Sequence, residues 1–228
     1  MPEVSNDLRV FNDFERRPEL LAKFDKAIEA YSAAAIFADV QYRTNVMDSG
    51  IKPAFRSKVT GQAITVQLSK GDLVDPLRAL EMGSPGDVIV VDAGGENTSV
   101  CGGLMGGLAQ NRGIRGMIVD GAGRDTDELE DINWPIWTRS ITPRGTHTMF
   151  SGRKEELSIN VPIACGGVVV NPGDFIVADL MGVVVVPIET AEEVVRLAQE
   201  QADREEETRK WVAKGKTVED LLNEFGRI

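Results

Sequence analysis

The sequence predicts an α/β protein built around a parallel sheet. Two strongly apolar segments, VIVVDA (88–93) and GMIVDG (116–121), are typical of strands buried on both faces. Between them, GGLMGGLAQNRG (102–113) predicts a helix whose glycines allow close packing against the sheet. A short acidic helix is expected over 124–131, directly after the second strand. Strand–helix–strand order with continuous apolar strands favours parallel pairing.

The segments before this core predict further elements. Residues 18–31 predict a helix, because apolar residues recur there at helical spacing after a proline that suits a first turn. Residues 33–40 fit either a short helix or a strand. The segment 61–68 alternates as a strand does, and 69–83 predicts a helix broken by Pro76.

The C-terminal half changes in character. Short strands are expected near 136–140, 159–164, 166–170, 174–179 and 182–187, separated by glycine and proline turns. A long helix over 189–213 and a short one over 217–224 close the chain. No low-complexity linker divides the sequence, so we expect one domain over 1–228, with an N-terminal arm (1–17) and C-terminal helices (189–228).

Composition excludes several kinds of chemistry. The chain has 228 residues and a formal net charge of −11, with one histidine, His147, and two cysteines, Cys101 and Cys165. A zinc site of His and Cys ligands cannot be assembled at the usual spacing, and a Ser-His-Asp triad would need His147. A metal would therefore bind among oxygen atoms, which favours Mg²⁺, Mn²⁺ or Ca²⁺.

The same composition bears on partners and compartment. The acidic balance argues against nucleic acid or an anionic membrane surface as a partner. Two cysteines far apart in the chain do not make a disulfide framework, which favours a reducing cytoplasm. The longest apolar run, near 181–188, is too short to span a bilayer. We expect a soluble, cytoplasmic protein.

The densest polar cluster follows the second buried strand. It reads Gly-Ala-Gly-Arg-Asp-Thr-Asp-Glu over 121–128, at the carboxyl end of a strand, where open α/β sheets bind ligands. Asp125 and Glu128 are three residues apart and project from one helix face, so they could hold one hard divalent ion. The alternative, which spacing alone favours, is an acidic first turn that complements the helix dipole.

A second candidate is the segment Cys101-Gly102-Gly103-Leu104-Met105. A glycine-rich helix start leaves backbone N–H groups available to a carboxylate, whereas the simpler interpretation is close helix–sheet contact. Neither glycine cluster matches a dinucleotide fingerprint, and the chain has no P-loop. His147 is either a general base or a surface residue, and both cysteines are interpreted as packing residues.

These blocks carry a family resemblance. CGGLMGGLAQNRGIRGMIVDGAGRDTDEL and VPIACGGVVVNPGDFIVADLMGVVVVP resemble the RraA-like family, which contains the ribonuclease regulator RraA and class II 4-hydroxy-4-methyl-2-oxoglutarate/4-carboxy-4-hydroxy-2-oxoadipate aldolases. The similarity covers roughly residues 30–225. It implies the family's swivelling β/β/α fold, with a central sheet, flanking helices and a long C-terminal helix. It also implies trimers or dimers of trimers with sites between subunits.

One family motif is altered in this chain. The family's aldolases carry an aspartate, twenty intervening residues, and then Arg-Asp. Counting back from Arg124 gives Gly103, so that aspartate is absent. Glu128 follows two residues after Asp125, which resembles a variant of metal-dependent members in which the later acid replaces the missing one. The regulators tend to lose the aspartate after the arginine, whereas this chain keeps Asp125, which favours an enzyme.

The resemblance implies roles for these residues. Asp125 would hold Mg²⁺ or Mn²⁺ with help from Glu128, and Arg124 would bind the keto oxygen of a pyruvoyl group. The backbone N–H groups after Gly103, those of Leu104 and Met105, would bind its carboxylate. A glutamate of a neighbouring subunit's C-terminal helix, Glu205 or Glu206, would complete the metal site.

The function implied is a lyase that cleaves 4-hydroxy-2-oxo acids to pyruvate, decarboxylates oxaloacetate, or does both. The alternative is a non-catalytic regulator that binds a ribonuclease or another protein. A third possibility is a lyase for sugar acids or other hydroxy acids at the same metal site.

Overall fold

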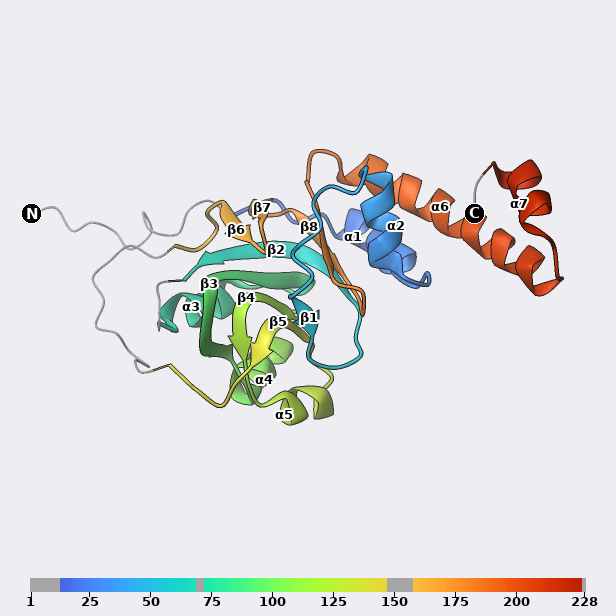
Figure 1. Ribbon diagram of the computed structural model, residues 1–228. Helices are drawn as coiled ribbons and strands as arrows, with labels where there is room; N and C mark the ends of the chain where they lie inside the picture. The colour runs from blue at the N-terminus through green and yellow to red at the C-terminus, as the bar shows by residue number, and fades with distance from the viewer. Residues whose placement is uncertain (1–12, 69–71, 147–157, 227–228) are drawn as a thin grey trace, which may run out of the picture.

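A computed structural model describes residues 13–68, 72–146 and 158–226 (Figure 1). Its main feature is a seven-stranded mixed sheet with the order β1-β5-β4-β3-β2-β8-β9. The strands are β1 (Lys52–Pro53), β2 (Val59–Gln67), β3 (Asp87–Cys101), β4 (Met117–Gly123), β5 (Ile136–Ile141), β8 (Phe175–Ala178) and β9 (Val183–Val186). Strands β2 to β5 run parallel, while β1, β8 and β9 pair antiparallel at the edges. The predicted parallel core is thus confirmed for its four central strands.

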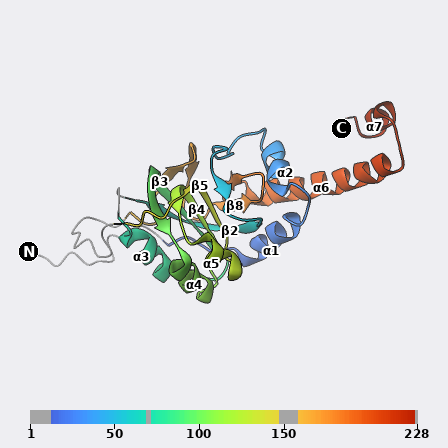
Figure 2. The ribbon, with the colours of Figure 1, turned by 60° about the horizontal axis from the view of Figure 1, so that its bottom comes forward.

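Helices flank the sheet in two groups (Figures 1 and 2). The first group is α3 (Val74–Met82), α4 (Gly103–Asn111) and α5 (Thr126–Asp131). The second is α1 (Pro18–Ala27), α2 (Ala33–Val40) and α6 (Ala191–Ala213), which pack around β8 and β9. A hairpin of β6 (Ile163–Cys165) and β7 (Val168–Val170) covers the remaining surface of the sheet.

Three apolar clusters hold these layers together. One lies between the sheet and α3, α4 and α5, and includes the fully buried Leu129 and Trp134. The second is centred on stacked aromatic rings, with Phe24 and Phe175 centroids 4.4 Å apart. The third joins the sheet to the β6–β7 hairpin and contains Trp137, whose indole N–H donates to the carbonyl of Asp179 at 2.9 Å. Because the central strands are buried on both faces, their apolar runs are continuous.

Several predicted boundaries are wrong. The first helix ends at Ala27 rather than at residue 31, and 33–40, which was ambiguous, is helical. Pro76 lies in the first turn of α3, where a backbone N–H has no intrahelical partner, so it does not break the helix. The strand β1 was not predicted, because two residues are too short to show a period.

The strand predicted over 88–93 continues as far as Cys101. Gly94 and Gly95, with φ of 61° and 72°, bend it, and its register with β4 shifts at three points beyond Asp92. The predicted strand at 159–164 is reduced to Ile163–Cys165, although Ile159 forms an isolated bridge with Val66. The alternation of apolar and polar residues, and continuous apolar runs, do not predict such irregular strand pairing.

The two chain ends differ in how they join the body. Residues 1–12 of the predicted arm lie outside the described residues. Arg16, near the end of this arm, forms an ion pair with the buried Asp87, with 3.0 Å between Nη2 and Oδ2. At the other end, α6 extends away from the sheet and carries α7 (Val218–Phe225) at its tip (Figures 1 and 2). An edge contact between Trp211 and Phe225 joins these two helices. Within the described residues, no helix is both long and apolar enough to cross a bilayer.

Candidate active site

The site begins where β3 ends and α4 starts. Gly102 is the N-cap of α4, with an extended backbone, and the first intrahelical bond runs from the Gly106 N–H to the Gly102 carbonyl at 3.0 Å. The N–H groups of Gly103, Leu104 and Met105 therefore precede the hydrogen-bonded ladder of the helix. Such groups, together with the helix dipole, make a binding site for a carboxylate.

Asp125 lies beside this helix start, at the end of the neighbouring strand β4. Its φ of 51° and ψ of 43° place it in the left-handed region, which is uncommon for residues other than glycine. Its Oδ2 accepts a hydrogen bond from the Gly103 N–H at 3.2 Å. The sequence predicts a helix that starts at Arg124, whereas α5 begins at Thr126. The left-handed backbone of Asp125 explains this difference.

Glu128 turns its carboxylate to the same place. An ideal Cβ on Gly103 would overlap its Oε2, and an ideal Cβ on Gly102 would overlap the Oδ2 of Asp125. Two consecutive glycines thus make room for two carboxylates from the start of α5. The structure brings together the two motifs that the sequence had presented as separate candidates.

Arg124 completes the cluster. Its backbone N–H donates to the carbonyl of Cys101 at 2.9 Å, which ties the end of β4 to β3. Its side chain is about half exposed, with Nε 3.4 Å from the Asp125 Oδ2. Gly145 lies beside the guanidinium, and an ideal Cβ there would be 2.8 Å from Nη1. The Ser99 N–H donates to the carbonyl of Arg144 at 2.8 Å, which holds this loop over the site.

A cavity of about 240 Å³ opens between these groups. Its described lining residues are Leu73, Leu77, Ser99, Val100, Cys101, Gly102, Leu104, Met105, Leu108, Arg124, Asp125, Gly145 and Thr146. Among the described residues, no three His, Cys, Asp or Glu side chains gather closely enough to hold a metal ion unaided. The carboxylates of Asp125 and Glu128 nonetheless fit a hard divalent ion whose remaining positions are open to water or substrate.

Glu205 and Glu206 lie elsewhere in the same chain. Glu205 accepts hydrogen bonds from Gln201 and Arg209, both at 2.9 Å, while Arg209 also pairs with Glu206 at 3.5 Å. All of these residues are on α6, which projects on the other side of the sheet from α4 and α5 (Figures 1 and 2). A role for Glu205 in the site therefore requires a neighbouring subunit and stays a prediction. His147 lies outside the described residues.

The cysteines are packing residues, as the sequence predicted. Both are buried. Burial raises the pKa of the Cys101 thiol to about 12, with a smaller contribution from the charge of Asp125. Burial also raises the pKa of Cys165, whose Sγ lies 3.7 Å from the carbonyl oxygen of Val91. Neutral thiols are poor nucleophiles, so neither residue adds chemistry to the site.

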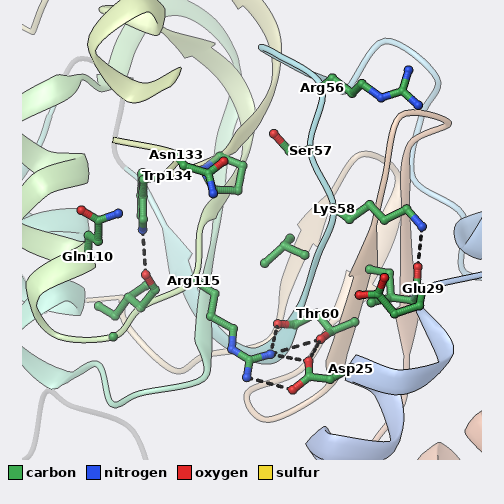
Figure 3. A pocket seen from close by; sticks show the side chains of 15 residues that line it. Asp25, Glu29, Arg56, Ser57, Lys58, Thr60, Gln110, Arg115, Asn133 and Trp134 are labelled. Carbon is green, nitrogen blue, oxygen red and sulfur yellow. Dashed lines mark hydrogen bonds and ion pairs between the residues drawn. The ribbon is translucent and has the colours of Figure 1, made fainter. Parts of the chain in front are cut away.

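A larger cavity, of about 640 Å³, lies where β2, β4 and β5 begin (Figure 3). Three of its charged side chains already have hydrogen-bond partners. Arg115 binds both carboxylate oxygens of Asp25, at 2.5 and 3.0 Å, and Lys58 Nζ donates to the carbonyls of Ile28 and Ala30 at 2.6 and 2.8 Å. No sequence pattern indicates this cavity, because its lining comes from separate segments. It contains none of the predicted site residues.

Comparison with known proteins agrees with this fold. The family model RraA-like, described as Aldolase/RraA, matches residues 24–185. This match spans more than half of the chain, and the chain belongs to the RraA-like family. The family and fold predicted from the sequence are confirmed.

Individual relatives carry two kinds of name. A Halalkalibacterium halodurans protein named "Putative 4-hydroxy-4-methyl-2-oxoglutarate aldolase" is 43% identical over 162 residues, which cover 70% of this chain and 75% of that protein. A Thermus thermophilus protein named 4-hydroxy-4-methyl-2-oxoglutarate aldolase is 31% identical, covering 58% of this chain and 77% of that one. A crystal structure from Streptomyces coelicolor, an unusual member of the RNase ES inhibitor RraA protein family, is 33% identical with a TM-score of 0.71. It covers 86% of this chain and 99% of that one.

Proposed function

We propose that this protein is a divalent-metal-dependent lyase that cleaves 4-hydroxy-2-oxo acids to pyruvate and decarboxylates oxaloacetate. The observation that carries this proposal is the meeting of the Asp125 and Glu128 carboxylates with the start of α4, beside Arg124. The names of the aldolase relatives support a lyase of this type.

The site can bind the pyruvoyl end of such a substrate. Its carboxylate would accept hydrogen bonds from the N–H groups of Leu104 and Met105 at the start of α4. Arg124 would donate to the 2-oxo oxygen, since its guanidinium borders the same cavity. Asp125 and Glu128 would hold Mg²⁺ or Mn²⁺, which when bound supplies positive charge to the oxygen of the forming enolate.

Both reactions break a carbon–carbon bond and leave a pyruvate enolate. In the aldol cleavage, the C4 hydroxyl loses its proton, the C3–C4 bond breaks, and its electron pair passes to the enolate, which is then protonated at C3. Arg124 stabilises the charge on the enolate oxygen. A pre-positioned donor of this kind is worth about 3 kcal/mol, or about a hundredfold in rate.

A neighbouring subunit enters the proposal through α6. In a trimer or a dimer of trimers, Glu205 of an adjacent chain would reach the metal and complete its ligands. A monomer in size-exclusion chromatography with full activity would contradict this part. The proposed location is the cytoplasm, where 2-oxo acids are metabolised and where free cysteines persist.

A non-catalytic regulator is the second candidate. It is favoured by the similarity to the Streptomyces coelicolor member of the RNase ES inhibitor family. A regulator would bind a ribonuclease or another protein, and it would have no need of a metal at Asp125.

One assay separates the two candidates. Pyruvate release is measured with oxaloacetate and with 4-hydroxy-4-methyl-2-oxoglutarate, first with Mg²⁺ and then with EDTA. The lyase predicts release that the chelator abolishes, and Arg124→Ala serves as the inactive control. Absence of release from both substrates, or release that EDTA leaves unchanged, would contradict the proposal.

A further inference from the structure

One side of the site cavity is built from leucines. Leu73 and Leu77 are four residues apart at the start of α3, and Leu104 and Leu108 are four residues apart on α4. Side chains at this spacing share a helix face. The two helices lie side by side (Figures 1 and 2), so both pairs border the same cavity as Arg124.

The two leucines of α4 are exposed, whereas Leu73 and Leu77 are partly buried against the apolar cluster between the sheet and its helices. Leu104 is 83% exposed and Leu108 is 56% exposed, although both are large apolar residues. They adjoin the carboxylate-binding start of α4, so the cavity passes directly from a polar end to an apolar end. An apolar wall with a few polar groups at one end is typical of a small-molecule site.

The charge of the cavity limits what its apolar end can hold. Among the described lining residues, Arg124 is the only cation. In the proposed lyase, Arg124 binds the 2-oxo oxygen. Of the hydroxyl groups, that of Ser99 already donates to the carbonyl of Cys101 at 2.9 Å, which leaves Thr146. A second carboxylate on the substrate would face the leucines, and the described lining of this chain offers it no cationic partner; burying an unpaired charge is costly.

We propose that the preferred substrates are monocarboxylic 4-hydroxy-2-oxo acids that carry an alkyl group at C4, and that the leucine wall binds this group. The inference rests on the proposed lyase and names its substrate class. The reaction is the same cleavage. The C4 hydroxyl loses its proton, the C3–C4 bond breaks, an alkyl ketone or aldehyde leaves, and pyruvate forms when its enolate is protonated at C3.

A matched pair of substrates tests the preference. The acids 4-hydroxy-4-methyl-2-oxopentanoate and 4-hydroxy-4-methyl-2-oxoglutarate differ only by a methyl group in place of a carboxylate at C4. With the Mg²⁺-loaded protein, we expect kcat/KM for the methyl compound to be higher by about tenfold or more. Equal or faster cleavage of the dicarboxylate would overturn the inference while leaving the lyase intact.

A variant tests whether the leucine wall sets the preference. Leu108→Arg places a cation on the apolar side, so we expect the ratio of the two kcat/KM values to fall by about tenfold toward the dicarboxylate. The control is Leu222→Arg on α7, a leucine that is 47% exposed and far from the cavity, which should leave the ratio unchanged. A Leu108→Arg protein that dissociates in size-exclusion chromatography with an unchanged ratio would show that the leucines form a subunit interface, and would overturn the inference.

Binding gives a reading that does not depend on turnover. The unreactive analogues 2-oxopentanoate and 2-oxoglutarate differ by the same exchange, and isothermal titration in Mg²⁺ should show tighter binding of 2-oxopentanoate. This result with no pyruvate release from any hydroxy acid would support the apolar subsite and reject the lyase. Tighter binding of 2-oxoglutarate would overturn the subsite, whatever the outcome of the activity assay.

Discussion

The carboxylate of Glu128 occupies the space that a side chain on residue 103 would need. An ideal Cβ on Gly103 would overlap both the Oε2 and the Cδ of Glu128. This side of the site therefore has room for one acidic side chain, supplied either from the start of α4 or from the first turn of α5. In this chain, the glycine at 103 is what leaves room for the acid at 128.

The first prediction exchanges these two positions. Gly103→Asp alone should lower both stability and activity, because the new side chain meets Glu128, and overpacking costs about 1–3 kcal/mol. Glu128→Ala alone should reduce Mg²⁺-dependent pyruvate release by about a hundredfold. The double variant should recover most of that loss, because the aspartate enters the vacated space. A double variant no better than Glu128→Ala would show that the two acids are not interchangeable.

The second prediction concerns Arg124. Arg124→Ala should reduce kcat/KM by about a hundredfold or more, because the charge on the enolate oxygen loses its donor. Arg124→Lys should retain part of the activity, since it keeps the charge without the planar fork. The melting temperature should change little in either variant, because the side chain is half exposed and the backbone bond to Cys101 remains. Full activity in Arg124→Ala would remove this residue from the mechanism.

How much of this site could be read from the sequence depends on the kind of signal. The apolar run of β4 and the Arg-Asp pair after it correctly located the carboxyl end of a buried strand. The contact between Glu128 and Gly103 was harder to predict, because no local pattern shows that Glu128 lies against Gly103 and not in solvent. The left-handed conformation of Asp125 was also missed, since helical spacing assumes regular backbone from the first residue.

The same contrast holds for the fold. A continuous apolar run indicates a buried parallel strand, so the sequence located β3 and β4. Irregular pairing beyond Asp92 and the two-residue strand β1 leave no periodic pattern. Whether α6 packs along its length or projects could not be seen either, because its helical pattern is the same in both cases.

The third prediction separates stability from activity at Asp125. Asp125→Gly suits the left-handed backbone but increases the freedom of the unfolded chain, and these effects oppose each other. We expect a change in unfolding free energy below about 1 kcal/mol, together with a loss of about a hundredfold in Mg²⁺-dependent activity. Asp125→Asn is the matched variant, which keeps the shape and removes the charge. Denaturant unfolding and pyruvate release measure both quantities, and retained activity in Asp125→Asn would place the metal elsewhere.

The fourth prediction concerns acid stability. Hydrogen bonds from the Gly50 N–H and from Arg139 hold the pKa of Asp48 below its ordinary value. A folded-state pKa lower than the unfolded one means that the ionised carboxylate favours folding above the ordinary value of 3.8. This contribution is lost as the pH falls through the folded-state pKa. Wild type should therefore lose more stability than Asp48→Asn between pH 5 and the acid range, as measured by urea unfolding. Parallel pH curves would contradict the assignment.

The last prediction concerns the thiol next to the site. Burial raises the pKa of Cys101 to about 12, so this thiol is protonated at neutral pH, and a protonated thiol reacts slowly with electrophiles. Native protein at pH 8 should therefore not react with a disulfide reagent, and pyruvate release should survive the treatment. Both cysteines should react once the chain is unfolded in denaturant, which serves as the control for reagent and count. Rapid labelling of Cys101 in the native protein would mean that β3 opens beside Gly102 and that the start of α4 is not the fixed carboxylate site proposed here.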